Sequence, residues 1–447
     1  MSLKFYNTMG RKMQEFKPLK DGFCGFYGCG PTVYNDIHIG NGRPVVFFDV
    51  VKRFFKYIGY KVTMVENFTD IDDKIIKKAL EEKVPEEVIS KRYIEAFLKV
   101  CKDAGCLEDI IHPKVTETIP EILSFIKALV DKGYAYLSGD DVYFRVRNVP
   151  TYGMLSNQKL DELESGARID VNSQKEDPSD FTLWKKTSDE GKKWDSEFGS
   201  GRPGWHTECV VMINNIFGGV IDIHGGGVDL KFPHHENEIA QSMALHGNAI
   251  ANYWLHNARI DLKGEKMSKS VGNVIWLKDV LRDYPYQAYR LFILANHYRQ
   301  NVSYSEELMS NMANEWTKLR KAYVSLYRTL ELKGAFNKEL KDETYMDKFL
   351  TEMAYDFNTA NALTAIYEHI KLINKAIRDK NTDTETLVKL FNALDDMYEV
   401  FGITVDILPL SSEELELVNS WQQARIEKDF TKADELRAKI TEAGIEL

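Results

Sequence analysis

The sequence lacks a long hydrophobic run, and this absence bears on where the protein works. No stretch approaches the ~18 uncharged apolar residues that a membrane-spanning helix needs, so no membrane partner is expected. The first residues, MSLKFY, form no apolar run of signal-peptide length. We therefore expect a cytoplasmic protein.

Cysteine and positive charge are also scarce. The cysteines are Cys24, Cys29, Cys101, Cys106 and Cys209. Five is an odd number spread over 447 residues, which excludes a disulfide scaffold and indicates a reducing compartment where some thiols serve a metal. The net charge of −10 argues against nonspecific coating of nucleic acid. A specific nucleic-acid partner stays open, because residues 286–330 carry six Lys/Arg against three Glu, although a solvated helical face has the same composition.

The order of apolar patterns predicts a mixed fold. The length predicts about three domains, and 44% apolar and 28% charged residues are typical of a globular protein. An apolar run at 23–27, helical spacing over 43–54 and a β-branched run at 60–65 predict consecutive elements of a parallel α/β unit. Another strand is expected at 220–224. Residues from about 156 to 204 are expected to form an insertion with exposed loops.

The pattern changes in the second half of the chain. Apolar residues at three- and four-residue spacing over 306–401 predict a helical bundle. Pro409 and the serines after it mark a linker, and Ser412 is expected to cap a helix that begins at Glu413. A last small helical unit follows.

Several familiar ligand motifs are incomplete. Residues 28–33, GCGPTV, lack the third glycine of a dinucleotide fingerprint, and no GxxxxGK[ST] loop is present. Residues 70–74 begin like a calcium loop, but Ile75 occupies the position where an EF-hand needs glycine. Phosphate chemistry must therefore lie in other segments.

Two separated segments carry residues suited to a nucleotide. In PTVYNDIHIGNGR, His38 can donate a hydrogen bond to a phosphate oxygen, and Gly40 allows close approach to the start of a helix. In KMSKS, Lys266 and Lys269 lie in a loop between glycines, which suits a lid that neutralises developing negative charge. Alone, HIG is more often a turn and KMSKS any polar loop. Together and in this order, they resemble the two signatures of class I aminoacyl-tRNA synthetases.

A third group of residues has the composition of a metal site. His234 and Glu238 lie four residues apart, on one face if this stretch is helical. A zinc protease motif would need a histidine at Ile239, so that interpretation fails. With Cys29 and Cys209, the pair makes a donor set that suits Zn²⁺. Spacing alone equally allows buried small cysteines and histidines on a polar surface.

Over nearly its whole length the sequence resembles the cysteinyl-tRNA synthetase family. The resemblance is carried by GCGPTVY, TDIDDKII, GRPGWH, DIHGGG, FPHHENE and KMSKS, which begin at residues 28, 69, 201, 222, 232 and 266. It implies one zinc ion per chain, held by Cys29, Cys209, His234 and Glu238. His234 then belongs to the site rather than to a polar surface.

The resemblance also assigns the substrate sites. It implies a cysteine pocket formed by Cys29, Thr69, Trp205 and His224. It implies an ATP site, used with Mg²⁺, formed by Thr32, His38, Gly40, Asn41, Gly225, Gly227, Asp229, Lys266 and Lys269. The catalytic residues among these would be His38, Asn41, Lys266 and Lys269. Asn41 stands where many class I members have a second histidine, but asparagine still donates hydrogen bonds.

The family's architecture gives an expected domain order. The fold would be α/β, with a Rossmann-type parallel-sheet catalytic domain, an inserted connective segment, an α-helical bundle and a small C-terminal anticodon-binding unit. The corresponding residues are 1–117 with 200–255, 118–199, 306–404 and 405–447. Residues 256–305 would be the stem-contact region with the KMSKS loop. The family usually continues into a tail beyond residues 433–437, so the last unit is expected to be short.

The implied activity is that of a monomeric ligase. It would activate L-cysteine with ATP to give cysteinyl-adenylate and transfer the cysteinyl group to tRNA(Cys). Two alternatives remain. One is a ligase that joins cysteine to an amino sugar on the same catalytic core, and the other is a non-catalytic tRNA-binding paralogue.

Overall fold

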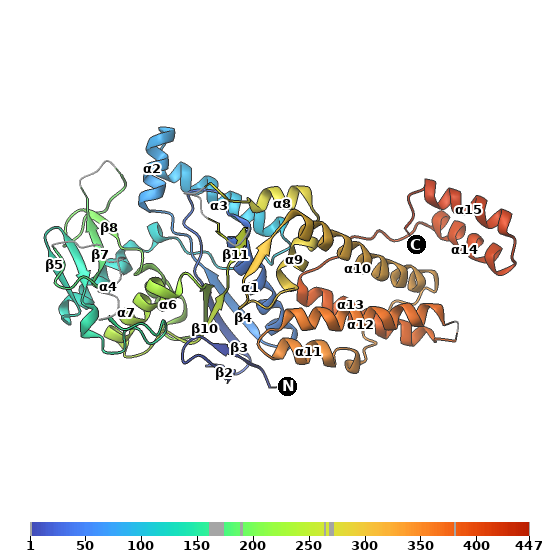
Figure 1. The fold of residues 1–447 in the computed structure, drawn as a ribbon, viewed down its shortest axis with the longest axis horizontal. Helices are drawn as coiled ribbons and strands as arrows, with labels where there is room; N and C mark the ends of the chain where they lie inside the picture. Colours follow the sequence, from blue (N-terminus) through green and yellow to red (C-terminus); the bar gives the residue numbers. More distant parts are fainter. Residues whose placement is uncertain are drawn as a thin grey trace. The chain divides into compact units, whose positions relative to one another are not determined.

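The computed structural model describes residues 2–160, 174–187, 191–262, 265–267, 272–379 and 381–446, with only the backbone at 265–266. The chain divides into two compact units (Figure 1). The α/β unit comprises Met1–Asp283, His297–Ser305 and Ala354–Phe357. The helical unit comprises Tyr284–Asn296, Glu306–Met353 and Asn358–Leu447.

A four-stranded parallel sheet forms the centre of the α/β unit. Its strands are β3 (Phe23–Gly28), β4 (Lys61–Glu66), β9 (Ile221–Gly227) and β10 (Ala251–Asn257), in the spatial order β10-β9-β3-β4. The successive residues Cys24, Gly25, Phe26 and Tyr27 are all buried, which is typical of a parallel strand covered on both faces. The predicted parallel α/β fold is therefore confirmed.

The helices between these strands decide where a ligand can bind. Helix α1 (Ile39–Tyr57) connects β3 to β4, and α7 (Glu236–His246) connects β9 to β10. The two connections leave the centre of the sheet in opposite directions, so right-handed crossovers place α1 and α7 on opposite faces. The neighbours β3 and β9 thus flank a topological switch point, beyond whose carboxyl ends ligands bind in such sheets.

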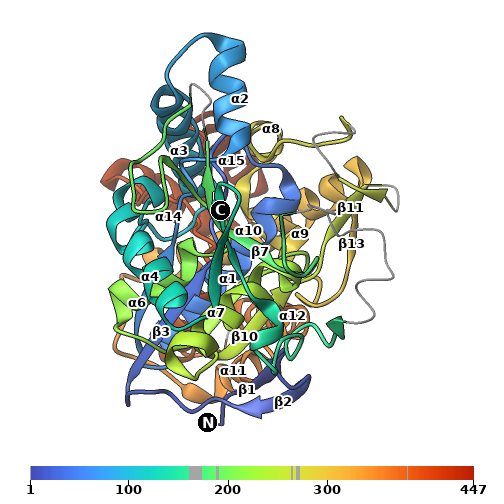
Figure 2. The ribbon, with the colours of Figure 1, turned by 90° about the vertical axis from the view of Figure 1, so that its left-hand side faces the viewer.

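A second sheet is inserted between β4 and β9 and faces the viewer in Figure 2. Its antiparallel strands are β5 (Ala135–Ser138), β6 (Asp141–Phe144), β7 (Phe181–Lys186) and β8 (Gly201–Pro203). Helices α4 (Ile119–Asp131) and α6 (Glu208–Phe217) share a hydrophobic core with β7. The expectation of exposed loops over 156–204 is wrong for β7, because Leu183 and Trp184 are fully buried in that core.

Two small sheets and further helices complete the α/β unit. Strands β1 (Lys4–Asn7) and β2 (Lys12–Glu15) form a hairpin, while β11 (Ile260–Leu262) pairs with β12 (Glu265–Lys266) and β13 (Val302–Tyr304). The helices are α2 (Asp73–Glu82), α3 (Glu86–Asp103) and α8 (Leu277–Asp283). The backbone N–H of Ile39 donates to the carbonyl of Ile275 at 3.0 Å. The start of α1 is therefore hydrogen-bonded to the segment that follows the KMSKS loop.

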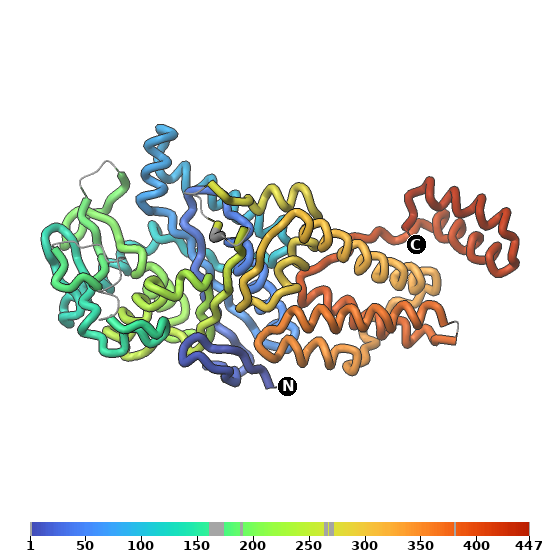
Figure 3. The backbone as a smooth tube through the Cα atoms, in the orientation of Figure 1, coloured from blue at the N-terminus to red at the C-terminus, as the bar shows by residue number. Residues whose placement is uncertain are grey.

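The helical unit contains the predicted bundle. Its helices are α9 (Tyr286–Leu294), α10 (Glu306–Leu332), α11 (Asp347–Ala354), α12 (Thr359–Arg378) and α13 (Thr384–Phe401). Leu319, Tyr323, Leu326 and Leu330 of α10 are buried, as their spacing predicts. Figure 3 traces α12 and α13 as antiparallel neighbours. Among the described residues, no helix combines the length and apolar character that crossing a membrane requires.

The last two helices, α14 (Ser412–Ile426) and α15 (Phe430–Glu442), pack against each other. The cap of α14 is Ser411, whose hydroxyl accepts the N–H of Glu414 at 3.2 Å while the Glu414 carboxylate accepts the N–H of Ser411 at 2.7 Å. The expectation that Ser412 is the cap is wrong. The helix starts one residue earlier than expected, so Ser412 lies inside its first turn.

The cap predicts a difference between two adjacent serines. Ser411→Ala should lower the stability of the first turn of α14 by about 1 kcal/mol, because the N–H of Glu414 loses its acceptor. Ser412→Ala should change the stability of this turn by only a few tenths of a kcal/mol. Amide hydrogen exchange of α14 measures both effects, and a larger effect at Ser412 would contradict the assignment.

Candidate active site

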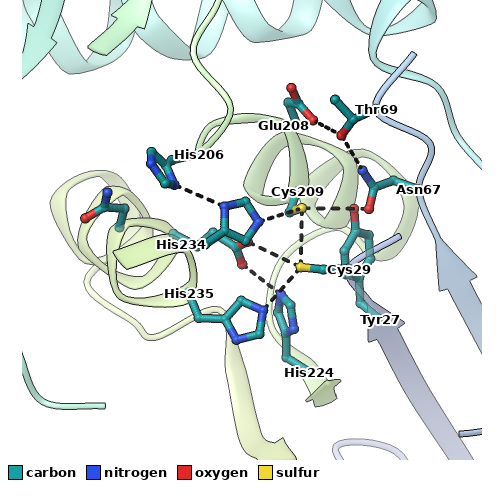
Figure 4. A network of polar contacts seen from close by, with 12 residues as sticks. Tyr27, Cys29, Asn67, Thr69, His206, Glu208, Cys209, His224, His234 and His235 are labelled. Atoms are coloured by element: carbon teal, nitrogen blue, oxygen red, sulfur yellow. Dashed lines mark hydrogen bonds and ion pairs between the residues drawn. The ribbon is translucent and has the colours of Figure 1, made fainter. Parts of the chain in front are cut away.

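Four potential metal ligands meet beyond the carboxyl end of β3. Cys29 follows this strand, Cys209 lies on α6, Glu238 lies on α7 and His234 precedes that helix. One ligand atom from each lies within 4.8 Å of the other three, and Figure 4 shows Cys29, Cys209 and His234 side by side. The two Sγ atoms are 3.7 Å apart, and His234 Nε2 lies 2.9 Å from Glu238 Oε1. Residues distant in sequence therefore form one compact donor set.

The local fold explains why His234 and Glu238 meet. Helix α7 begins only at Glu236, and the turn over Lys231–His235 that leads into it is interrupted by extended backbone at Phe232. The four-residue spacing still brings the imidazole onto the carboxylate. His234 and His235 are 2% and 0% exposed, so the interpretation of both as polar surface residues is wrong.

A second group overlaps the first. Cys29, His224, His235 and Glu238 also offer ligand atoms within 4.8 Å of one another. His224 Nε2 lies 2.7 Å from Glu238 Oε2, and His235 Nε2 lies 3.2 Å from Cys29 Sγ. Both groups fit a zinc ion by chemistry, since each combines thiol, imidazole and carboxylate donors. The group with Cys209 offers two sulfur donors and the other offers one.

Electrostatics favour the ionised forms of Glu238 and Cys209, whereas burial raises the pKa of the Cys29 thiol. Burial opposes ionisation of Glu238, but His224 and His234 outweigh it and hold the pKa of this carboxyl group well below its usual value. Burial likewise raises the pKa of the Cys209 thiol, yet hydrogen bonds with Cys29 and His234 bring it down to about 7. An acidic thiol beside an ionised carboxylate is a strong cation site.

Aromatic rings hold the imidazoles in place. Trp205 stacks on His234 with 4.2 Å between ring centroids and 18° between planes, and Trp254 stacks on His224 with 4.5 Å and 11°. His206 Nδ1 lies 3.0 Å from His234 Nδ1. Trp205 is 42% exposed, so it forms a boundary between the cluster and solvent.

A pocket of about 270 Å³ adjoins the cluster and reaches both nucleotide segments. The predicted residues that line it are Cys29, Thr32, His38, Gly40, Asn41, Trp205, Gly227 and Asp229. His38 caps α1, because its Nδ1 accepts the N–H of Asn41 at 3.2 Å. Met267 of the KMSKS loop also lines the pocket, and a Cβ on Gly40 would lie 3.3 Å from its methyl group. The helix start and the loop thus face one space, which suits an anion.

Other predicted residues lie beside the pocket or outside the description. Thr69 is buried and donates its hydroxyl to Glu208 Oε2 at 2.7 Å. The carbonyl of Gly225 accepts the N–H of Cys29 at 3.2 Å. A Cβ atom added to Gly225 would lie 2.5 Å from the Phe48 ring. Only the backbone of Lys266 is described, in β12. Lys269 lies outside the described residues.

The sequence analysis missed two polar residues at strand ends. Glu66 ends β4 and lines the pocket, and burial raises the pKa of its carboxyl group to about 8. Asn257 ends β10, and both polar atoms of its buried side chain lack a hydrogen-bond partner among the described residues. Ligand-binding groups gather at the carboxyl ends of parallel strands, so the position of both residues at the end of a strand could have identified them.

Comparisons with known proteins define the class. Residues 15–314 match the family model of the class I (C) tRNA synthetase catalytic domain, and residues 348–406 match the DALR domain. The solved Mycobacterium tuberculosis methionyl-tRNA synthetase bound by methionyl-adenylate has a TM-score of 0.62 and 14% identity, over 93% of this chain and 96% of that chain. At that identity the likeness concerns the fold alone. The fold and the matched domain are those of a class I tRNA synthetase.

Curated relatives narrow the class to a family. The cysteine–tRNA ligase of Finegoldia magna is 47% identical over 100% of this chain and 97% of its own length. Those of Bacillus licheniformis and Acholeplasma laidlawii are each 44% identical, over 100% and 99% of this chain and 97% and 99% of their own lengths. The chain belongs to the cysteine–tRNA ligase family.

The raised pKa of Glu66 predicts a pH dependence of stability. In the folded protein its carboxyl group keeps a proton up to about pH 8. In the unfolded chain the group has its ordinary pKa of 4.5 and loses the proton at a much lower pH. Wild-type stability should therefore fall as pH rises from about 5 to 8. Glu66→Gln has no proton to lose, so its free energy of unfolding should rise by about 2 kcal/mol relative to that of wild type over this range. The side chain is 14% exposed, and contact with solvent keeps the difference below what the full pKa shift would give.

Urea unfolding at several pH values, followed by circular dichroism, tests this expectation. Glu121→Gln, on the exposed side of α4, is the matched control and should not change the pH profile. A constant difference between Glu66→Gln and wild type would mean that Glu66 is ionised in the folded protein.

Proposed function

We propose that this chain is a cysteine–tRNA ligase that activates L-cysteine with ATP and transfers it to tRNA(Cys). The observation that carries the proposal is the Cys29–Cys209–His234–Glu238 cluster, which opens onto the pocket shared by both nucleotide segments. The full-length curated relatives bear the same name. These relatives support neither an amino-sugar ligase nor a non-catalytic paralogue, and the DALR match favours a tRNA acceptor.

The donor set fits one zinc ion, which Cys29, Cys209, His234 and Glu238 would hold. A bound zinc ion supplies affinity for a soft sulfur donor, which the hydroxyl of serine lacks. Shape alone separates such near-isosteric substrates by only ~1–3 kcal/mol. Accurate translation requires a ratio of ~10⁴, which corresponds to about 5.5 kcal/mol. Selection by sulfur chemistry therefore replaces selection by size.

The remaining residues bind and position the reactants. Thr69, Trp205 and His224 would hold cysteine beside the cluster. Its carboxylate attacks the α-phosphorus of ATP and pyrophosphate leaves, so the reaction needs no protein nucleophile. His38 and Asn41 would donate hydrogen bonds to the phosphates at the start of α1. The other ATP contacts would come from Thr32, Gly40, Gly225, Gly227 and Asp229.

Charge on the phosphates needs further stabilisation in the transition state. Lys266 and Lys269 of the KMSKS loop would provide it together with Mg²⁺. The hydrogen bond from Ile39 N–H to Ile275 supports this assignment, because it ties the segment after the loop to the start of α1.

The domain roles follow the same proposal. The residues at 1–117 and 200–255 would carry the chemistry, with 118–199 inserted, and 256–305 would contact the acceptor stem of the tRNA. The bundle at 306–404 and the unit at 405–447 would bind the rest of the tRNA. Residues 411–447 carry five Lys/Arg against nine acidic groups, so they would read anticodon bases by hydrogen bonds and stacking rather than by bulk charge.

Removal of one sulfur ligand tests the activity and the metal together. Wild-type protein should contain one zinc and catalyse cysteine-dependent ATP–pyrophosphate exchange. Cys209→Ser should lose most of the zinc, and its preference for cysteine over serine should fall from at least ~10⁴ towards ~10², the value that shape alone allows. Elemental analysis and exchange kinetics with both amino acids measure these changes.

The matched control is Cys101→Ser, a cysteine of α3 outside the cluster, which should behave like wild type. A wild-type protein that activated cysteine selectively without any metal would contradict the zinc assignment. A wild-type protein that made adenylate but charged only an amino sugar would contradict the choice of acceptor.

Deletion of residues 409–447 should separate the two half-reactions. None of the described residues from 409 to 446 lines the pocket or belongs to the cluster, so cysteine-dependent exchange should remain near wild type. Charging of tRNA(Cys) should fall at least ~10-fold, since the loss of base stacking alone costs ~1–3 kcal/mol per base. Exchange and aminoacylation rates are the measurements.

The deletion also removes Glu446, whose carboxylate accepts from both terminal nitrogens of Arg320 at 2.7 and 2.6 Å. Arg320→Ala breaks this contact but keeps α14 and α15, so it controls for the loss of anchoring. A deletion variant that charged tRNA as well as wild type would contradict the role given to these helices.

A further inference from the structure

A line of hydrogen bonds leads from the metal cluster to the N-terminal segment. His235 Nε2 lies 3.2 Å from Cys29 Sγ, a contact drawn in Figure 4. His235 Nδ1 lies 2.9 Å from His256 Nε2, and His256 Nδ1 lies 2.8 Å from Thr8 Oγ1. Three side chains far apart in sequence thus link Cys29 to the turn that follows β1.

The line is shielded from solvent. His235, His256 and Thr8 are 0%, 6% and 8% exposed. Two imidazole nitrogens in contact share one hydrogen bond, and a neutral imidazole carries one N–H donor and one lone pair. Because each nitrogen is used once, the direction of one hydrogen bond fixes the direction of the others.

A thiolate at Cys29 determines that direction. Zinc binds cysteine as a thiolate, and a thiolate can only accept hydrogen bonds. His235 Nε2–H then donates to Cys29 Sγ, which leaves a lone pair on His235 Nδ1. That lone pair accepts from His256 Nε2–H, and His256 Nδ1 accepts from the Thr8 hydroxyl. Every hydrogen in the line then has one donor and one acceptor.

We infer that Thr8, His256 and His235 act as positioning residues that hold the Cys29 thiolate in place for the metal without binding the metal themselves. This inference rests on the proposed function, because it takes Cys29, Cys209, His234 and Glu238 as the ligands. In the overlapping group, His235 would be a ligand and would have no N–H to give to Cys29. The inference therefore favours the ligand group that contains Cys209 over the group that contains His235.

Cys29 is the ligand that most needs an external anchor. It lies in a loop between Gly28 and Gly30, whereas Cys209 and Glu238 lie on helices. Glu238 and His234 also have partners of their own, in His224 at 2.7 Å and His206 at 3.0 Å. Two thiolates and a carboxylate exceed the charge of Zn²⁺ by one, and a donated N–H disperses part of that excess.

The far end of the line is rigid. The backbone N–H of Thr8 donates to the carbonyl of Trp254 at 3.0 Å. The side chain of Asn7 donates to the carbonyl of Asn252 at 2.8 Å and accepts the N–H of Trp254 at 2.9 Å. The turn after β1 is therefore fixed along β10, two residues from His256. Thr8 presents its hydroxyl to His256 from this fixed frame.

A pair of conservative variants tests the inference. Thr8→Val keeps the size and branching but removes the hydroxyl, whereas Thr8→Ser keeps the hydroxyl. Chelator competition with Zn²⁺ should show about 3- to 10-fold weaker binding for Thr8→Val and wild-type binding for Thr8→Ser. Outer-shell partners of metal ligands are worth 10–100-fold, and Thr8 acts one step further away. His256→Phe, which leaves His235 without its donor, should lose about 10–100-fold.

Cobalt substitution supplies a readout that global stability does not move. Co²⁺ bound to wild type should show the thiolate-to-metal charge-transfer absorption of two sulfur ligands, and Thr8→Val should shift this band while Thr8→Ser leaves it unchanged. An absorption typical of one sulfur ligand would make His235 a ligand and overturn the inference. So would equal zinc affinities of wild type, Thr8→Val and His256→Phe.

The failures of the two proposals are distinguishable. A wild-type protein that bound no zinc would overturn both the metal assignment and this inference. A wild-type protein that bound zinc through two thiolates but failed to activate cysteine would overturn the proposed function alone. Equal affinities in an active wild type and its variants would overturn only the positioning line.

Discussion

The adjacent carboxyl ends of β3 and β9 are the constraint on which the site depends. The chain leaves these neighbouring strands in opposite directions, so no connection covers the crevice between their ends. Cys29 follows β3, while α7, which carries Glu238, lies on the connection from β9 to β10. The same edge carries the start of α1 with its His38 cap. The candidate metal cluster and the start of α1 thus share one crevice because of topology rather than sequence proximity.

Burial then makes the charges of the cluster strongly interdependent. Glu238 is fully buried, and removal of a carboxylate from water is unfavourable unless it is paired and hydrogen-bonded. His224 and His234 meet that condition on its two oxygens, at 2.7 and 2.9 Å. The indole rings of Trp205 and Trp254 stack on these same imidazoles and limit their rotation. The aromatic contacts therefore fix where the histidine nitrogens point and so maintain the hydrogen bonds that pair the Glu238 carboxylate.

The sequence predicted what local patterns can encode. The strand at 23–27, the helix after it, the strands at 60–65 and 220–224 and the later bundle all follow from apolar spacing. The cap at Ser411 and the burial of β7 were mispredicted, since a one-residue shift and a partner sheet leave no mark on the pattern. Thr8 and His256 lie 248 residues apart, so only the tertiary fold reveals their contact.

A histidine next to Cys29 suits a metal site better than a lysine or arginine would. A lysine or arginine next to Cys29 would neutralise the excess negative charge, but a buried cation brings a desolvation cost of several kcal/mol and competes with the metal for the ligands. A neutral imidazole donates an equally directed hydrogen bond and adds no net charge. Its second nitrogen passes the constraint onward, as from His235 to His256. The cluster can therefore stay attractive to a cation while its most weakly supported ligand is held by the packed core.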